Sequence, residues 1–281
     1  MSPIKTHRID CHQHFWNYDP DKHSWMNQEM GILKTDFLPA DLFPHLQNCE
    51  LEGCVAVQAS QTDAENTFLL GLAAHHDFIK GVVGWVDLRA PDLEERLDYY
   101  QKFPKIKGFR HVIHDEPALD FMLETAFMTG VSKLKKYDYT YDILIFEKHL
   151  PNALKFVKTF SEQPFVIDHI AKPLIKEQIT EDWAKNIKKM AAYENVFCKI
   201  SGMVTEAHWT NWAKKDFVKY LDTIIETFGS ERIMYGSDWP VCQLAATYEE
   251  QFDIVKDYFS SFSQTEQSRF FGANATHFYR L

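Results

Sequence analysis

Residues 164–170 read PFVIDHI, a short apolar run that ends in an acidic residue and a histidine. The apolar residues at 165–167 are consecutive, so both faces of a strand formed here would be apolar. Continuous apolar runs of this length are typical of parallel strands that are buried on both faces. The stretch therefore predicts an interior strand that carries polar side chains at its carboxyl end.

Seven further segments have the same character, being short and rich in β-branched or aromatic residues. The starts of consecutive segments are 23 to 46 residues apart, which leaves room for a helix in each gap. The eight predicted strands are Arg8–Phe15, Cys54–Ser60, Gly81–Leu88, Lys107–Ile113, Tyr141–Phe146, Pro164–Ile170, Asn195–Ser201 and Arg232–Asp238. A strand–helix unit repeated eight times predicts an α/β fold, a single-domain (β/α)8 TIM barrel spanning residues 1–281.

The gaps between these segments carry helical patterns. Apolar residues recur at helical spacing over 217–228, and Ser263 with Glu266 fits a capping box, which predicts a last short helix that ends near Gly272. An open, doubly wound sheet is the alternative arrangement, but no glycine-rich phosphate turn follows any predicted strand. No linker rich in Pro, Gly or Ser divides the chain, so we expect one domain.

The longest gap follows the first predicted strand and is rich in aromatic residues. It contains Trp16, Tyr18, Trp25, Phe37 and Phe43. A long loop at this place lies over the carboxyl-terminal mouth of a barrel, where active sites are built. Its aromatic rings would either stack on the apolar face of a sugar or pack the loop onto the barrel, and the sequence leaves both open.

Composition narrows the class of partner. The 281 residues include 30 Lys and Arg against 40 Asp and Glu, a formal charge of −10, which argues against nucleic acid. No stretch approaches about 18 apolar residues, which argues against a membrane partner, and the amino terminus lacks the apolar core of a signal peptide. Five cysteines without a Cys-x-x-Cys pair fit a reduced intracellular protein. We expect a cytoplasmic protein that binds a small molecule, with homo-oligomer formation left open.

Two histidines stand at the end of the first predicted strand. His12 and His14 are two residues apart, and because side chains alternate along a strand they point to the same side. Neutral imidazole is a common ligand of zinc and related divalent ions. The pair alone is weak support for a metal site, because neighbouring histidines often occur by chance.

Two more polar residues end predicted strands in the same way. The apolar run at 165–167 leads to His169, and residues 233–235 lead to Asp238, with Gly236 leaving room inside the barrel. A buried polar group without a partner costs about 1–3 kcal/mol, so a core strand rarely ends on one by accident. Capping or a structural salt bridge is the alternative for Asp238. Because the carboxyl ends of barrel strands share one mouth, we expect these groups to meet there. The predicted metal ligands are His12, His14, His169 and Asp238.

Several motifs together resemble the amidohydrolase superfamily, in particular its sugar-lactonase branch, which includes L-fuconolactonase, L-rhamnono-lactonase and 2-pyrone-4,6-dicarboxylate lactonase. The motifs are IDCHQHFW at 9–16, KGFRHV at 107–112, DHIAKP at 168–173, KISG at 199–202 and YGSDWP at 235–240. The resemblance implies a barrel hydrolase that acts on a carboxylic ester bond. Its substrate would be an aldono-1,4- or 1,5-lactone such as L-fucono- or L-rhamnonolactone, opened to the aldonic acid. A divalent cation, zinc, is implied as cofactor, although some members work without a metal.

One departure from the family limits the metal count. Members with two metals carry a bridging Lys or Glu on the fourth strand and a further histidine on the fifth. The fourth predicted strand has Arg110 and His111 instead, and the nearest histidine to the fifth is His149, three residues beyond it. We therefore expect one divalent cation at a mononuclear site, or none.

Lactone hydrolysis needs an activated water and donors for the oxyanion that develops. We expect Asp238 to act as general base, since a carboxyl with a pKa of about 3.9 is ionised at neutral pH, and an enclosed site would raise its basicity. His169 is the second expected catalytic residue. A divalent ion would act as Lewis acid; without one, the histidines with Arg110 or Lys172 would donate to the oxyanion. A thiol mechanism on Cys242 is disfavoured, because no base is tied to it.

Further residues on or just beyond predicted strands are expected to bind the substrate. The cationic side chains would hold ring hydroxyls or the emerging carboxylate, or else form structural ion pairs with Asp10 or Asp168. The aromatic ones would wall the pocket or belong to the core. The predicted substrate-binding residues are Trp16, Trp85, Arg110, His111, Lys172, Lys199 and Trp239.

Two other functions stay open at this level. The wider superfamily carries metal-dependent decarboxylation on the same barrel, and a barrel of this kind could also bind a sugar acid without turning it over. Acid release from aldonolactones, carbon dioxide release from carboxylic acids, and binding without turnover distinguish the three.

Overall fold

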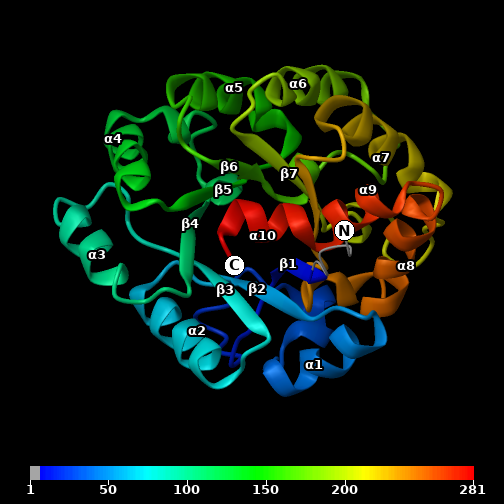
Figure 1. Cartoon of the computed structure of the whole chain (residues 1–281), viewed down its shortest axis with the longest axis horizontal. Helices are drawn as coiled ribbons and strands as arrows, with labels where there is room; N and C mark the ends of the chain where they lie inside the picture. Colours follow the sequence, from blue (N-terminus) through cyan, green and yellow to red (C-terminus); the bar gives the residue numbers. More distant parts are fainter. Residues whose placement is uncertain (1–6) are drawn as a thin grey trace, which may run out of the picture.

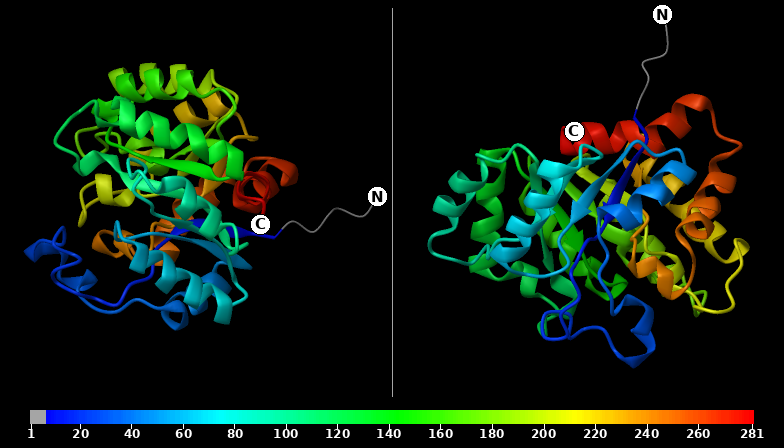
Figure 2. Two further views of the ribbon diagram at one scale, coloured as in Figure 1. Left: turned by 90° about the vertical axis from the view of Figure 1, so that its left-hand side faces the viewer. Right: turned by 90° about the horizontal axis from the view of Figure 1, so that it is seen from below.

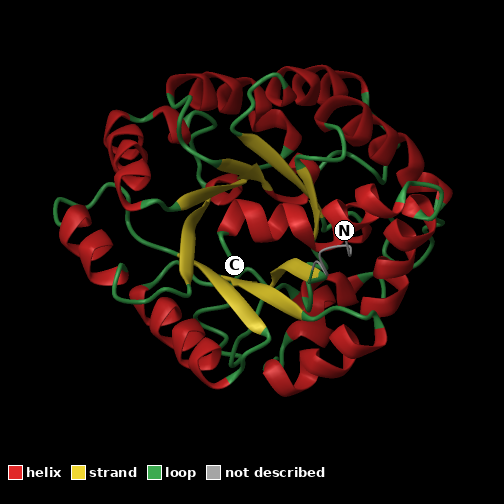
Figure 3. Cartoon of the chain, viewed as in Figure 1, coloured by secondary structure: helices red, strands yellow, loops and turns green. Residues whose placement is uncertain are grey.

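Eight strands form one sheet in the computed structural model, which describes residues 7–281 (Figures 1 and 3). Neighbouring strands run parallel in the order of the sequence. Backbone hydrogen bonds from Asp238 to His12 and from His14 to Trp239 bring the ends of the sheet together. The strands are β1 (Ile9–Gln13), β2 (Gly53–Val57), β3 (Ile79–Gly84), β4 (Ile106–Val112), β5 (Thr140–Leu144), β6 (Phe165–Ile167), β7 (Val196–Ile200) and β8 (Ile233–Tyr235). The predicted (β/α)8 barrel is confirmed.

A ring of helices surrounds the sheet (Figure 3). The helices are α1 (Pro39–Asn48), α2 (Asp63–His75), α3 (Leu93–Tyr100), α4 (Thr125–Leu134), α5 (Leu150–Thr159), α6 (Glu181–Ala191), α7 (Lys215–Phe228), α8 (Tyr248–Phe259), α9 (Gln264–Ser268) and α10 (Asn274–Tyr279). The apolar residues of the 217–228 pattern are buried on α7, and Ser263 caps α9 as predicted. Among residues 7–281, no helix combines the length and the apolar character needed to cross a membrane.

Burial on both faces explains the apolar runs of the strands. On β2, Val55 and Val57 belong to an apolar cluster inside the barrel, whereas Cys54 and Ala56 belong to the larger cluster between barrel and helices. Full burial of a valine side chain stabilises the fold by about 1.5 kcal/mol or more, so polar residues are disfavoured at either set of positions. The inward-facing charged residues described below are exceptions that need partners.

The last helix extends beyond its predicted end and closes one end of the barrel. After a single π-helical turn (Arg269–Ala273) the chain continues into α10, which lies across the amino-terminal end of the strands (Figure 1). Phe278 and Tyr279 join the interior apolar cluster there. The prediction that the helix ends near Gly272 is wrong, because burial of these apolar residues outweighs the low helix propensity of one glycine.

Two strands end earlier than predicted. β6 and β8 each contain three residues, so His169 and Asp238 lie in turns beyond them and not on the strands. Both residues have left-handed backbone conformations, with φ angles of 52° and 58°. Such conformations cost a non-glycine residue about 1–2 kcal/mol, which local sequence patterns do not predict.

The long loop after β1 lies at the opposite end of the barrel from α10 (Figure 2). Trp16 pairs with Phe37 through two backbone hydrogen bonds, which fold the loop back on itself around a short 3-10 helix (Gln28–Leu33). Trp16 is 2% exposed, whereas Trp25 is 39% exposed. The predicted aromatic loop is therefore present, and part of it packs onto the barrel.

Candidate active site

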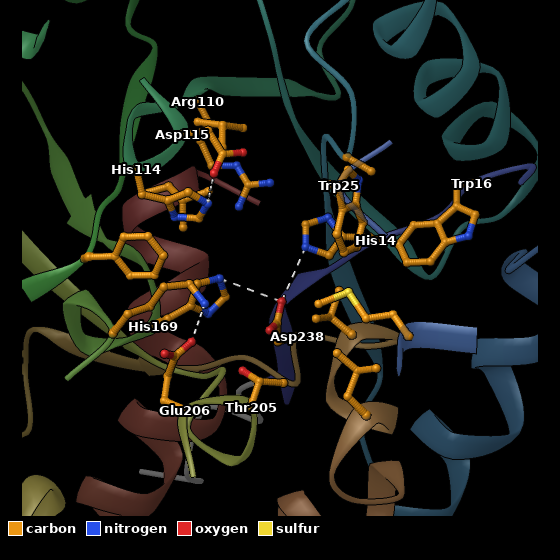
Figure 4. A pocket seen from close by; sticks show the side chains of 18 of the residues that line it. His14, Trp16, Trp25, Arg110, His114, Asp115, His169, Thr205, Glu206 and Asp238 are labelled. Atoms are coloured by element: carbon orange, nitrogen blue, oxygen red, sulfur yellow. Dashed lines mark hydrogen bonds and ion pairs between the residues drawn. The ribbon is translucent and has the colours of Figure 1, made fainter. Parts of the chain in front are cut away.

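A cavity of about 350 Å³ opens at the carboxyl end of the barrel (Figure 4). Its apolar side comes from the loops after β1 and β8. Its polar side comes from β4 and from the loops after β4, β6 and β7, and two more aromatic rings, Phe146 after β5 and Trp209 after β7, also line the cavity. The apolar side includes Trp16, Trp25, Met30, Val241 and Leu244. The polar side includes Arg110, His114, Asp115, Lys172, Thr205 and Glu206. His14, His169 and Asp238 also line the cavity and face one another in Figure 4.

β1 delivers two imidazoles to one place. The Nε2 atoms of His12 and His14 are 3.2 Å apart, so both rings reach the same side of the sheet, as predicted. His14 Nδ1 donates to the carbonyl oxygen of Val57 over 2.8 Å. A neutral ring with its proton on Nδ1 presents the lone pair of Nε2, which is the form of histidine that binds a metal ion.

Asp238 brings a carboxylate to these imidazoles. Its Oδ1 atom lies 3.4 Å from His14 Nε2, 3.8 Å from His12 Nε2 and 3.7 Å from His169 Nε2. Gly236 makes the approach of β8 to β1 possible, because a Cβ at this position would lie 2.6 Å from the Cβ of His12. The structure thus brings the four predicted ligands together.

The charge states of these groups follow from burial and from one another. Burial by itself raises the pKa of the Asp238 carboxyl, but the neighbouring His169 and His14 outweigh burial, and the pKa lies below its ordinary value. Burial lowers the pKa of both His12 and His169, so their rings are neutral. The Asp238 carboxyl is therefore ionised at neutral pH.

A strained turn aims His169 at Asp238. The four residues from His169 to Lys172 all have φ between 46° and 62°, in the left-handed region. Gly202 lies against the ring, where a Cβ would be 2.6 Å from His169 Nδ1, so a larger residue would displace the imidazole. His169 Nδ1 is 2.9 Å from Ser201 Oγ, which leaves Nε2 toward Asp238. Backbone strain of this kind is typical of functional sites.

The donor set fits one divalent cation. Ligands about 2.0–2.1 Å from a tetrahedral zinc ion are about 3.3 Å apart, close to the separations among His12, His14 and Asp238. Asp168 Oδ1 is buried and lies 3.3 Å from His12 Nδ1 and 3.0 Å from Lys199 Nζ. This oxygen is placed to accept the Nδ1 proton of His12 when Nε2 binds a cation. His149, the candidate for a second metal, instead directs Nδ1 to the carbonyl oxygen of Phe146 and does not line the cavity.

Residues 9–281 match the family model described as amidohydrolase. The chain belongs to the amidohydrolase family. The L-fucono-1,5-lactonase of Burkholderia multivorans is 39% identical over 285 residues, which cover 98% of this chain and 96% of that protein. The L-fucono-1,5-lactonase of Burkholderia ambifaria is 33% identical over 290 residues, with the same coverage of both chains. A crystal structure of a Burkholderia multivorans amidohydrolase with bound zinc has a TM-score of 0.95 and 40% identity, and the match covers 98% of this chain and 99% of that one. The resemblance inferred from the motifs is confirmed.

Two of the positively charged side chains that were predicted to bind the substrate, those of Arg110 and Lys172, line the cavity of this amidohydrolase. Arg110 Nη1 lies 3.1 Å from Asp168 Oδ2 and 3.3 Å from His12 Nε2. Lys172 Nζ donates to Glu206 Oε1 over 2.5 Å at the edge of the cavity. Each side chain therefore forms an ion pair and also faces the space that a substrate would fill.

Two other predicted substrate-binding residues point away from the cavity. Neighbouring residues on a strand face opposite sides, so His111 points outward because Arg110 points inward. The ring of His111 stacks on Phe121 and donates to Glu116 over 2.6 Å. Trp85 follows β3 and donates its indole N–H to His111 Nδ1 over 3.3 Å. Neither residue lines the cavity, so both predicted contacts with the substrate are withdrawn.

Lys199 and Trp239 also lie outside the cavity lining. Lys199 points into the barrel but ends below the cavity, where Nζ is 2.6 Å from Asp142 Oδ2 and 3.0 Å from Asp168 Oδ1. Trp239 is 1% exposed and packs edge-to-face on Phe37 beneath the long loop. We withdraw both as substrate contacts, because other parts of the protein fill the space around them.

Four polar residues of the cavity were not predicted, namely His114, Asp115, Thr205 and Glu206. His114 and Asp115 follow β4 directly, and Glu206 lies in the loop after β7. Burial lowers the pKa of His114 to about 3, with Lys172 and Arg110 adding to the effect, so its ring is neutral and stacks on Phe146. The sequence did contain a signal for His114, because it comes just after a predicted strand, as His169 and Asp238 stand at the ends of two others.

Proposed function

We propose that this chain is a hydrolase that opens an aldono-1,5- or 1,4-lactone, such as L-fucono- or L-rhamnonolactone, to the aldonic acid. The observation that carries the proposal is the meeting of Asp238 with three imidazoles at the bottom of a cavity that is partly lined by aromatic side chains. Two relatives with more than 30% identity, both L-fucono-1,5-lactonases, support the reaction class. The cavity volume of about 350 Å³ suits a single sugar ring.

The two sides of the cavity suit the two kinds of surface on a sugar lactone. The half-exposed ring of Trp25 offers a surface on which the apolar C–H face of the substrate would pack, and the buried Trp16 supports it at the edge of the cavity. Across the cavity, Arg110, Lys172 and His114 carry N–H groups that would donate to ring hydroxyls or to the carbonyl oxygen. A substrate held between the two sides would place its ester carbon near Asp238.

Asp238 is the proposed general base. Its carboxylate is ionised and lies within 3.8 Å of three imidazoles, so a water held among these groups would be within reach of Oδ1. Asp238 would accept a proton as the water oxygen bonds to the carbonyl carbon, and would return it to the ring oxygen as the ester bond breaks. His169, fixed by Ser201 and Gly202, would orient the water and stabilise the charge that develops.

A mononuclear zinc ion is the proposed cofactor. His12, His14, His169 and Asp238 would hold it, and when bound it would polarise the carbonyl group and lower the pKa of the water. The protein supplies the neutral imidazoles and their orientation through Val57, Ser201 and Asp168. We expect about one zinc per purified chain and loss of activity on chelation, restored by added zinc. Full turnover by metal-free protein, checked by elemental analysis, would contradict the zinc assignment.

The reaction is tested by acid release, followed with a pH indicator, on a panel of aldonolactones. We expect turnover of at least one 1,5- or 1,4-lactone, with Asp238→Asn as the matched inactive control. Carbon dioxide release from aromatic or unsaturated carboxylic acids would instead favour a decarboxylase. Binding of sugar acids without turnover of any panel member would favour a binding protein.

A further inference from the structure

The positive charges that line the cavity are already paired with carboxylates. Arg110 and Lys172 are the two Lys or Arg side chains among the described residues of the lining. Arg110 Nη1 lies 3.1 Å from Asp168 Oδ2, and Arg110 Nη2 donates to the carbonyl oxygen of Gln58 over 2.5 Å. Lys172 Nζ donates to Glu206 Oε1 over 2.5 Å. A carboxylate on a bound molecule would therefore compete with a carboxylate of the protein for either side chain.

A further carboxylate at the same wall has no cationic partner. Asp115 Oδ1 lies 3.3 Å from His114 Nε2, but burial lowers the pKa of His114 to about 3, so this ring is neutral at ordinary pH. Among residues 7–281, no Lys or Arg nitrogen lies within ion-pair distance of the Asp115 carboxylate. Asp115, Lys172 and Glu206, here called the rim group, thus carry one positive and two negative formal charges.

The rim group lies nearer to the mouth of the cavity than the proposed general base does. The exposed fraction of the side chain is 13% for Lys172, 21% for Glu206 and 64% for Asp115, against 4% for Asp238. Figure 4 shows Asp115 and Glu206 on the side of the cavity opposite Trp25. A lactone with its ester carbon near Asp238 would therefore extend its far end toward the rim group.

We propose that Glu206 is a specificity-determining residue, which pairs with Lys172 so that the rim group accepts lactones with an uncharged far end and rejects those with a second carboxylate. A hydroxyl of the far end can donate to Glu206 or Asp115. A carboxylate there is repelled by both and finds no free ammonium group, and such like-charge contacts are an effective way to exclude a wrong ligand. This substrate class rests on the proposed lactonase function, whereas the preference in binding does not.

The test uses two substrates that differ in the far end. L-galactono-1,4-lactone carries a hydroxymethyl group where galactaro-1,4-lactone carries a carboxylate. For the wild type we expect kcat/KM to be about 100-fold higher with the neutral lactone. In Glu206→Gln the ammonium group of Lys172 is free to pair with the substrate, so kcat/KM for galactaro-1,4-lactone should rise about tenfold. Glu177→Gln is the matched control, because Glu177 is exposed and does not line the cavity, and it should leave both values unchanged.

Binding of the open-chain acids provides a measurement that needs no turnover. Galactarate has a carboxylate at the far end and galactonate has a hydroxymethyl group, and calorimetric titration measures the affinity of the full chain for each. We expect Glu206→Gln to bind galactarate about tenfold more tightly than the wild type does, with a smaller gain at high salt. The gain should vanish in the double variant Glu206→Gln with Lys172→Met, because it depends on the freed ammonium group.

Galactarate binding that is no tighter in Glu206→Gln than in the wild type would overturn the proposal. An equal gain in Glu177→Gln would also overturn it, because it would reflect the net charge of the protein. So would an equal fall of kcat/KM for both lactones in Glu206→Gln, which a purely structural role predicts. If the wild type hydrolyses no lactone, the proposed function fails, and galactarate binding still decides whether Glu206 excludes a second carboxylate.

Discussion

The two ends of the barrel are built by the same strands but differ in composition and backbone conformation. At the amino end, α10 covers the interior, and Phe278 packs against Phe197 with ring centroids 4.9 Å apart. At the carboxyl end, β6 and β8 stop after three residues, and left-handed turns direct His169 and Asp238 to the cavity. Apolar burial stabilises the first end, whereas the second holds buried polar groups and backbone strain.

A layer of buried charge separates these ends. Asp142, Asp168 and Lys199 face the barrel interior and have no exposed side-chain surface. Bringing charges out of water costs several kcal/mol per ion, so the layer is tolerated only because its members pair with one another. The comparison therefore predicts that substitutions at the amino end change stability, whereas substitutions at the carboxyl end change turnover or substrate binding.

Asp238→Asn should have the largest effect on turnover while leaving the stability of the fold almost unchanged. We expect kcat to fall about 10³-fold, because the amide accepts no proton from water, while the unfolding temperature stays within a few degrees of the wild type. Acid release from the best lactone and thermal unfolding measure the two quantities. Turnover near the wild-type level would remove Asp238 from the mechanism.

Phe278→Ala should have the opposite effect at the other end. Phe278 is 4% exposed, and truncation of such a ring leaves a cavity that costs about 3 kcal/mol in the free energy of unfolding. Denaturant unfolding measures this loss, and kcat of the folded protein should stay within about twofold of the wild type. A large fall in kcat with little loss of stability would contradict the division between the ends.

Lys172→Met should affect substrate binding at the carboxyl end. The side chain lines the cavity and pairs with Glu206, so its loss should raise KM about tenfold with a smaller change in kcat. Lys176→Met is the matched control, since Lys176 lies in the same loop but is exposed and does not line the cavity. Equal effects of the two variants would show that only the general charge of the loop matters.

Trp25→Ala should give the smallest effect. The ring is 39% exposed, so its loss removes part of the aromatic wall without opening the core. We expect KM to rise about threefold and the unfolding temperature to remain unchanged, since partly exposed rings contribute little to stability. An unfolding temperature lowered by many degrees would show that Trp25 secures the loop and does not serve the substrate.

Sequence patterns predicted the barrel and the four side chains at the bottom of the cavity. They were less successful in predicting which other residues line the cavity. His12, His14, His169 and Asp238 stand at or just beyond apolar runs, where the position along one strand is enough to place them at the mouth. Whether a positively charged side chain reaches the cavity depends on how far along the barrel axis its residue lies. Arg110 lines the cavity, whereas Lys199, also inward-facing, is held below it by Asp142 and Asp168.

Alternation along a single strand contained one further clue. Arg110 and His111 are neighbours on β4, so only one of them can face the interior, and the structure shows that it is Arg110. The turn residues beyond β6 and β8 gave no such clue, because left-handed conformations at non-glycine residues are imposed by tertiary contacts such as that between His169 and Gly202.

The order of apolar and polar residues along the chain determined the eight strands, the helices between them and the end of the barrel that carries the histidines. These features depend on neighbours in sequence, since burial on both faces and helical spacing are local patterns. Only the tertiary structure decided which inward-facing charges pair with one another and which line the cavity. Those outcomes depend on distances between strands that are far apart in sequence, and no local pattern encodes them.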